Sequence, residues 1–168
     1  NAKVLRATLE ERVEAARAFA NDCEFNRVEM HDTKIGVVTS GVSYQYARET
    51  FGDNASYLKL GLTFPLPYDL MKDFCSKVDK VYVVEEMDPY LEEHLKMLGI
   101  ECTGKDVIPH YDELNTDIVR KAFCGIEPET YTSDMQTVVR PPALCAGCPH
   151  RGLFYCISKR QKKDGLMI

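Results

Sequence analysis

Strand-like and helix-like patterns alternate through the middle of this chain, and the alternation constrains the fold more than any other feature. Buried strands rich in Val, Ile and Leu are predicted at residues 34–40, 55–62 and 80–86, with a short one at 100–104. Amphipathic helices are predicted at residues 41–52, 67–78, 88–99 and 112–123. Consecutive strand-helix units require right-handed crossovers, which place the strands in a mainly parallel sheet. We therefore predict an α/β domain with three layers, α/β/α, over residues 33–124.

Local signals indicate where some of these helices begin and end. Gly52 and Gly99 follow the last periodic residues of their helices, as glycine commonly does at a helix end. Asp88 and Pro89 suit a helix start, because aspartate caps free amides and proline is tolerated in the first turn. The pattern therefore predicts a third helix that is capped by the Asp88 side chain.

The segments on either side of the domain differ from it in pattern. Residues 1–32 begin with an amphipathic helix, which we expect to pack on the domain. Its apolar positions are Leu5, Leu9, Val13, Ala16 and Ala20. Residues 125–140 are polar and are interpreted as a linker, and residues 141–168 as the beginning of a further unit.

Composition and charge exclude several classes of partner. The chain of 168 residues has a formal net charge of −5, and its one basic run lies at residues 159–163, so no nucleic-acid partner is expected. No apolar run is long enough to cross a membrane and no signal peptide is recognisable, so we expect no membrane partner and a cytoplasmic location. Seven cysteines without a secretory signal favour a reducing compartment. Four of them are expected to be small buried side chains: Cys23, Cys75, Cys102 and Cys124.

Several polar residues of the predicted domain have both a functional and a structural interpretation. Residues 39–43 follow the first strand and could bind an anion at a helix start, but we favour a capping turn because no glycine-rich phosphate motif is present. Glu85 and Glu86 are adjacent and cannot act as a pair in a strand, so they are interpreted as solvated acids at a strand end. His94 and His110 are expected to be surface histidines.

The pair Cys145 and Cys148 carries the clearest chemical signal in the chain. Two thiolates at this spacing, in a loop rich in proline and glycine, can bind one metal ion or one iron of a cluster. Cys156 and His150 are not at a familiar ligand spacing, and Cys156 lies in a helical pattern where we expect it to be packed. The sequence therefore predicts half of a metal site, whose other ligands come from elsewhere.

Four segments together carry a resemblance to a known family. They are residues 36–49 (GVVTSGVSYQYARE), 58–67 (LKLGLTFPLP), 81–93 (VYVVEEMDPYLEE) and 140–152 (RPPALCAGCPHRG). In this order and spacing the chain resembles the alpha subunits of indolepyruvate ferredoxin oxidoreductases, which belong to the 2-oxoacid:ferredoxin oxidoreductase family. The resemblance extends from about residue 34 to the end of the sequence.

The resemblance implies an enzyme that contains thiamine diphosphate, Mg²⁺ and [4Fe-4S] clusters. Such an enzyme oxidatively decarboxylates aryl pyruvates to aryl acetyl-CoA and reduces ferredoxin. The implied partners of this chain are the other domains of the alpha subunit and the beta subunit, and through the whole enzyme ferredoxin and CoA. Residues 33–124 resemble the transketolase C-terminal-like module, and residues 141–168 resemble the beginning of the thiamine-diphosphate module.

The resemblance also implies roles for individual residues. Cys145 and Cys148 would be ligands of an iron–sulfur cluster, and His150 and Arg151 would lie near the thiamine site. The Gly-Asp-Gly…Asn motif that holds Mg²⁺ and the diphosphate in such modules is absent from this sequence. The chain is therefore expected to be an internal fragment that holds no complete cofactor, has no catalytic residue of its own and acts as an assembly module.

Two alternatives belong to other classes of protein. In the first, the chain is a small interaction domain whose cysteine loop binds zinc. In the second, it is a nucleotide-binding α/β enzyme that uses the turn at residues 39–43.

Overall fold

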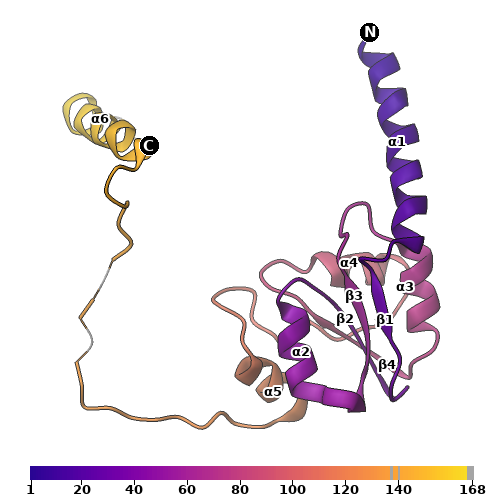
Figure 1. Cartoon of the computed structure of the whole chain (residues 1–168). Helices are drawn as coiled ribbons and strands as arrows, with labels where there is room; N and C mark the ends of the chain where they lie inside the picture. The colour runs from indigo at the N-terminus through magenta and orange to yellow at the C-terminus, as the bar shows by residue number, and fades with distance from the viewer. Residues whose placement is uncertain (137, 140, 166–168) are drawn as a thin grey trace. The chain divides into compact units, whose positions relative to one another are not determined.

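The centre of the first part of the chain is a mixed sheet in the order β1-β3-β2-β4 (Figure 1). The strands are β1 (Arg27–Glu29), β2 (Ile35–Ser40), β3 (Ser56–Leu60) and β4 (Lys80–Val84). Strand β2 pairs in parallel with both β3 and β4, and β1 pairs antiparallel to β3 at one edge. The prediction of a mainly parallel sheet is therefore confirmed.

The computed structural model describes residues 1–136, 138–139 and 141–165. The chain divides into two units, Asn1–Thr130 and Tyr131–Ile168. Thr137 and Arg140 of the predicted linker and residues 166–168 of the predicted C-terminal unit lie outside the described residues.

Helices cover both faces of the sheet and complete the predicted three-layer α/β/α arrangement (Figure 1). One layer contains α2 (Ser43–Phe51), the 3-10 turn η1 (Gly52–Asn54) and α5 (Thr116–Cys124), and the other contains α3 (Tyr68–Cys75) and α4 (Tyr90–Met97). Val37 of the central strand belongs to the core under α2 and α5, and its neighbour Val38 belongs to the core under α3 and α4. Both side chains are fully buried, because a parallel sheet is covered on its two faces.

Two elements differ from their predictions. The strand predicted at residues 100–104 is reduced to one bridge, in which Thr103 donates to the carbonyl of Val81 and accepts from the amide of Val83. The outer edge of β4 is therefore only partly covered. The last helix begins at Thr116, and not near residue 112, because the Asn115 side chain caps it by accepting from an amide of the first turn at 3.0 Å.

Helix α1 (Ala2–Asp22) contacts the rest of its unit near its carboxyl-terminal end and extends away from the sheet (Figure 1). Ala20 is the buried residue of this helix. Leu5 and Leu9 of the predicted apolar stripe are 70% and 49% exposed. The prediction that this helix packs on the domain is therefore wrong for most of its length, and the amino-terminal part of the stripe, at Leu5 and Leu9, forms an uncovered apolar surface.

The chain after α1 is held to the sheet by the side-chain amide of Asn26. Its nitrogen donates to the carbonyl of Ala20 at 2.8 Å, and its oxygen accepts from the amides of Gly61 and Leu62 at 2.9 Å each. Gly61 lies directly against the backbone of Phe25. This close approach requires a residue without a side chain at the end of β3.

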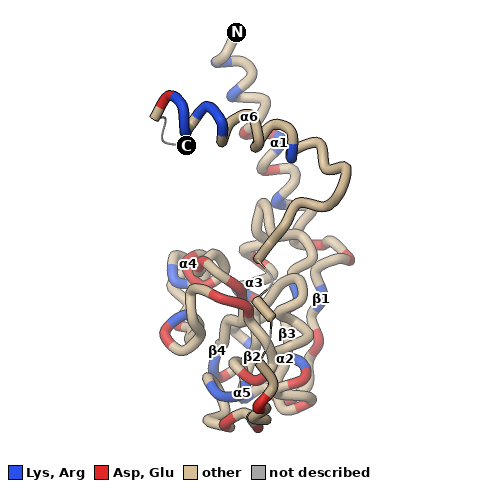
Figure 2. Tube along the Cα trace, turned by 90° about the vertical axis from the view of Figure 1, so that its left-hand side faces the viewer, with Lys and Arg blue, Asp and Glu red and all other residues tan. Residues whose placement is uncertain are grey.

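The second unit contains α6 (Pro149–Asp164), which follows residues without regular secondary structure in the described part. Pro149 occupies the first turn, and Gly165 ends the helix at a φ of 63°. Except for Arg151 in the first turn, the Lys and Arg residues of α6 lie in its carboxyl-terminal half (Figure 2). No described residue of this helix is buried within its own unit.

Each helix in the described part of the chain is too short or too polar to cross a membrane.

Replacing Gly61 with alanine tests the close approach between the end of β3 and Phe25. The added Cβ would overlap the Phe25 backbone, so we expect the free energy of unfolding to fall by about 1–3 kcal/mol. Urea unfolding followed by circular dichroism measures the change. Gly152→Ala is the matched control, because a Cβ there meets nothing within 4 Å. A midpoint for Gly61→Ala equal to that of the control would contradict the packing described here.

Candidate functional site

A crevice opens at the edge of the sheet where the parallel strands end. It lies between β2 and β4, and the chain leaves these two strands toward opposite sides of the sheet. From β2 the chain passes through α2 to β3 on one side, and from β4 it passes to α4 and the Thr103 bridge on the other. Ligands of open α/β sheets bind at such a switch point. The crevice encloses about 290 Å³ and its polar lining consists mainly of Ser40, Ser43, Thr63, Glu86, Asp88 and Tyr90.

Glu85 also lines this crevice, and it caps the following helix. It is 5% exposed, and its carboxylate accepts from the amides of Leu91 and Glu92 at 2.8 and 3.0 Å. The prediction of a solvated acid is therefore wrong for Glu85, whereas Glu86 is exposed. The predicted cap is also wrong: α4 begins after Pro89 without a side-chain bond from its own N-cap, and Glu85 replaces Asp88 in that role. Burial raises the pKa of Glu85, although the two amides and Lys105 act in the opposite direction.

A second buried carboxylate, Glu92, connects α4 to the loop that follows the Thr103 bridge. It accepts from the amide of Lys105 at 2.6 Å and from the ammonium of Lys96 at 2.6 Å. Burial alone would raise the pKa of Glu92, but these hydrogen bonds and the two lysine charges together lower it. The Lys105 ammonium donates to the carbonyl of Glu85 at 2.7 Å. Sequence reasoning missed this network because Lys105 lies 13 residues after Glu92 and 20 after Glu85, and no local motif connects them.

The turn at residues 39–43 forms the opposite wall of the crevice. The Thr39 hydroxyl is buried and donates to the carbonyl of Val84 at 2.7 Å, which ties β2 to β4. Helix α2 begins after Val42 without a side-chain cap. The interpretation of this turn as a capping turn is therefore wrong, and Ser43 lies in the first turn of the helix with a hydroxyl that does not cap it.

The two histidines of the first unit differ in environment. His94 is half-buried, its Nδ1 lies 2.9 Å from the hydroxyl of Tyr68, and its ring meets the ring of Tyr90 edge-on. The prediction of a surface histidine is therefore wrong for His94, because α3 and α4 bring aromatic partners to it. His110 is exposed, as predicted.

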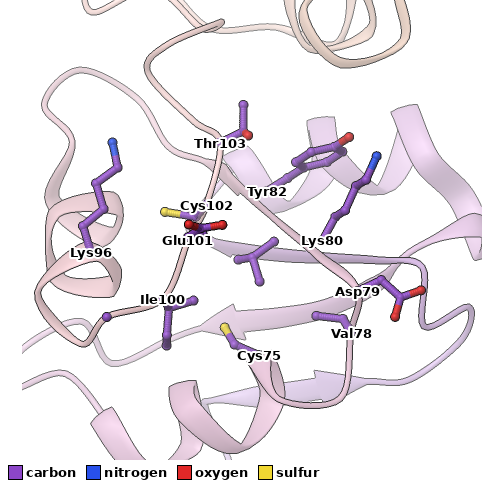
Figure 3. A pocket seen from close by; sticks show the side chains of 12 residues that line it. Cys75, Val78, Asp79, Lys80, Tyr82, Lys96, Ile100, Glu101, Cys102 and Thr103 are labelled. Carbon is purple, nitrogen blue, oxygen red and sulfur yellow. The ribbon is translucent and has the colours of Figure 1, made fainter.

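A larger groove of about 920 Å³ follows the partly covered outer edge of β4 (Figure 3). Cys75 and Cys102 line it, and burial raises the pKa of their thiols to about 12 and about 11. Such thiols are protonated at neutral pH and do not act as nucleophiles. Of the cysteines predicted to be buried, Cys23 and Cys75 are buried and Cys102 is half-buried, but Cys124 is exposed because it lies at the end of α5.

The cysteine loop of the second unit forms a tight turn. The amide of Cys148 donates to the carbonyl of Cys145 at 3.1 Å, and Gly147 between them has a φ of 81°. The Cys148 sulfur lies 3.6 Å from Nδ1 of His150, and Arg151 is exposed in the first turn of α6.

Cys145 is exposed and Cys148 is half-buried. Cys156 is also exposed, so the expectation that it is packed is wrong within the described unit. The turn brings the backbones of two cysteines close together, and their sulfur atoms would supply half of a tetrahedral set. Among the residues that the structure describes, no three His, Cys, Asp or Glu side chains form a group that could hold a metal ion.

The fold and the cysteine loop define an α/β unit of three layers joined to a segment with two adjacent thiol donors. Proteins with the printed name indolepyruvate oxidoreductase subunit IorA match this chain along most of its length. The protein from Thermococcus kodakarensis is 37% identical over 89% of the chain, that from Methanothermobacter thermautotrophicus 36% over 94%, and that from Archaeoglobus fulgidus 34% over 95%. The chain belongs to the family of these IorA subunits.

The matched region is a part of each relative. The chain spans 27% of the length of the Thermococcus kodakarensis protein and 28% of the other two. No protein-family profile matches the chain. No solved structure matches it either.

The environments of the cysteines predict their order of alkylation. At about pH 8 a thiol with a pKa near 11 or 12 is almost wholly protonated, so Cys75 and Cys102 should stay unlabelled by iodoacetamide in the folded chain. The exposed Cys124, Cys145 and Cys156 should react first. Peptide mass spectrometry over a time course measures the order. Rapid labelling of Cys75 without unfolding would contradict the burial described here.

The Glu92 network predicts a dependence of stability on pH. Because the pKa of Glu92 is lowered by folding, its contribution is present above the unfolded glutamate pKa of about 4.3 and is lost as the pH falls below that value. Glu92→Gln should therefore lower the free energy of unfolding by about 1–3 kcal/mol at neutral pH, and the deficit should shrink in acid. Urea unfolding from neutral pH to about pH 2, well below the unfolded glutamate pKa, measures both effects.

The adjacent Glu93→Gln is the matched control for this test, because Glu93 is exposed on the same helix. It should leave stability close to that of the parent chain at every pH. A deficit for Glu92→Gln that stays constant in acid would show that the charge of Glu92 does not contribute.

Proposed function

We propose that this chain is part of an indolepyruvate oxidoreductase and that residues 33–124 form its transketolase C-terminal-like assembly module. The observation that carries the proposal is the similarity to IorA subunits, which covers 89–95% of the chain in the three relatives named above. The three-layer fold with a parallel sheet suits such a module. We assign residues 125–140 to a linker and residues 141–168 to the beginning of the thiamine-diphosphate module.

Cys145 and Cys148 are proposed as two thiolate ligands of a [4Fe-4S] cluster. Their hydrogen-bonded turn supports this role, because it brings the two cysteines close together in a loop where Cys145 is exposed and Cys148 is half-buried. Thiolate-held clusters exchange single electrons, which is what the reduction of ferredoxin needs. The donors described in this chain are half of the required set, so the remaining ligands are assigned to other parts of the enzyme.

His150 and Arg151 are proposed to contact the thiamine-diphosphate site. Both are exposed in the first turn of α6, where side-chain donors and a helix amino terminus favour negatively charged groups. When bound, thiamine diphosphate supplies the electron sink for decarboxylation of an aryl pyruvate. The chain itself would contribute orientation of the cofactor, with Mg²⁺ and the diphosphate held by residues outside it.

Assembly is proposed as the main role of the chain within the enzyme. Its partners would be the other domains of the alpha subunit and the beta subunit, and through the whole enzyme ferredoxin and CoA. The exposed apolar stripe of α1, which includes Leu5 and Leu9, supports a packing role. Seven cysteines without a disulfide among the described residues suit a reducing cytoplasmic compartment. We infer that the isolated chain does not decarboxylate aryl pyruvates.

Anaerobic loading with iron and sulfide tests the proposed ligands. The chain should bind iron in a thiolate-type complex with visible charge-transfer absorption, and Cys145→Ser and Cys148→Ser should each lose most of that iron. Cys124→Ser is the matched control, because Cys124 is exposed outside the cysteine loop. In the longer polypeptide encoded by the source gene, the same two substitutions should abolish indolepyruvate-dependent reduction of ferredoxin. Stoichiometric zinc in the purified chain, with no iron taken up, would overturn the cluster in favour of a zinc-binding domain.

A further inference from the structure

We propose that Cys145 and Cys148 form a reversible intramolecular disulfide when their sulfur atoms hold no metal. The pair then has a second state besides the ligand role proposed above. The two states exclude each other, because a sulfur atom in a disulfide is no longer a thiolate donor. The disulfide itself needs no cluster, and it is carried by the geometry of the turn that contains both residues.

The turn between the two cysteines brings their backbones within the range of a disulfide. The amide of Cys148 donates to the carbonyl of Cys145 at 3.1 Å. Of the two central residues, Ala146 and Gly147, only the glycine has a positive φ, at 81°, as in a type II β-turn. The first and last Cα atoms of a β-turn are less than about 7 Å apart, and disulfides join Cα atoms that are about 4.4–6.8 Å apart. Closure of the disulfide therefore needs little movement of the backbone.

The exposure of the two cysteines gives the order in which they react. Cys145 is exposed and Cys148 is half-buried, so an oxidant of the low-molecular-weight disulfide class, such as oxidised glutathione, reaches Cys145 first. The Cys145 sulfur attacks one sulfur of oxidised glutathione, the glutathione disulfide bond breaks, and one reduced glutathione leaves. The Cys148 sulfur then attacks the Cys145 sulfur and displaces the second glutathione. Two protein thiols are oxidised, one oxidised glutathione becomes two thiols, and the two protons pass from the cysteines to these thiols.

Other cysteines are less suited to this reaction. Cys156 lies on α6 about two turns beyond Cys148, or roughly 12 Å along the helix axis, which exceeds the range of a disulfide. Cys75 and Cys102 line the groove beside β4, and burial raises the pKa of their thiols, so they react slowly. The reaction is therefore directed to the turn.

A disulfide at this position is readily reduced. It closes a loop of only four residues, so it constrains the unfolded chain little. Exposed disulfides are also the ones that thiols reduce most easily. The loop therefore returns to its dithiol state in reduced glutathione, and only that state offers two thiolates to a metal. The pair acts as a redox-controlled entry to the metal site.

Equilibration of the 168-residue chain in mixtures of oxidised and reduced glutathione, without metal, tests the proposal. After acid quenching and alkylation, tandem mass spectrometry of peptides distinguishes the internal disulfide from cysteines that carry glutathione. The internal disulfide should exceed the form with glutathione on both cysteines at least about tenfold, because its second step is intramolecular. Excess dithiothreitol should restore both thiols. A loop that carries two glutathiones, or that stays reduced in oxidised glutathione alone, would overturn the proposal.

Substitutions in and near the turn complete the test. Cys145→Ser and Cys148→Ser should each leave the remaining cysteine as a stable mixed disulfide, and Cys124→Ser should close the internal disulfide as the parent chain does. Gly147→Ala should lower the ratio of internal to mixed disulfide about fivefold, because alanine disfavours a positive φ. Gly152→Ala is the matched control, since a Cβ there meets nothing within 4 Å. Equal ratios in the two glycine variants, or a disulfide from the loop to Cys156, would overturn the proposal.

Iron uptake separates this proposal from the ligand role on which its metal-exclusion part rests. The reduced chain should take up at least about tenfold more iron than the chain with a closed disulfide. If the disulfide forms and the reduced chain takes up no iron, the cluster ligands are overturned and the disulfide stands. If iron loads on Cys145 and Cys148 and no disulfide forms, the disulfide is overturned and the ligands stand.

Discussion

The pairing of β2 with a parallel strand on each side is the constraint on which the rest of the first unit depends. A strand that is hydrogen-bonded on both edges and covered on both faces must satisfy every polar group internally. Thr39 does so by donating its buried hydroxyl to the carbonyl of Val84. Gly36 permits close packing over the strand, since a Cβ there would collide with the side chain of Val78, which follows α3. The helices above and below follow from this burial, because parallel strands need crossover connections.

The same pairing determines where a binding site can form in this unit. Parallel strands end at one edge, so the turns after β2 and β4 face each other across the crevice. Glu85 stabilises that edge, because its carboxylate accepts hydrogen bonds from two amides in the first turn of α4. Glu86 and Asp88 are exposed on the rim, and Ser43 lines the crevice opposite them. A carboxylate that stabilises the fold, Glu85, is thus followed within three residues by two exposed carboxylates, Glu86 and Asp88.

The conformation of the cysteine loop, in contrast, depends only on residues that are neighbours in the chain. A turn of four residues with glycine at positive φ brings Cys145 and Cys148 together without help from a sheet. Its donor set remains incomplete among the described residues. This is consistent with the chain spanning about a quarter of the length of its IorA relatives.

The features that the sequence alone determined are those that depend on short-range patterns of residues. The alternation of strand and helix between residues 34 and 124 was sufficient to predict the three layers. The spacing of Cys145 and Cys148 was sufficient to place both in one loop, and their role as metal ligands stays a prediction. The tertiary structure decided which polar residue caps which helix, because Glu85 reaches α4 across a loop while the nearer Asp88 does not. It also decided that the apolar face of α1 stays uncovered and that His94 meets Tyr68. These outcomes depend on contacts between residues far apart in the chain, which no local pattern encodes.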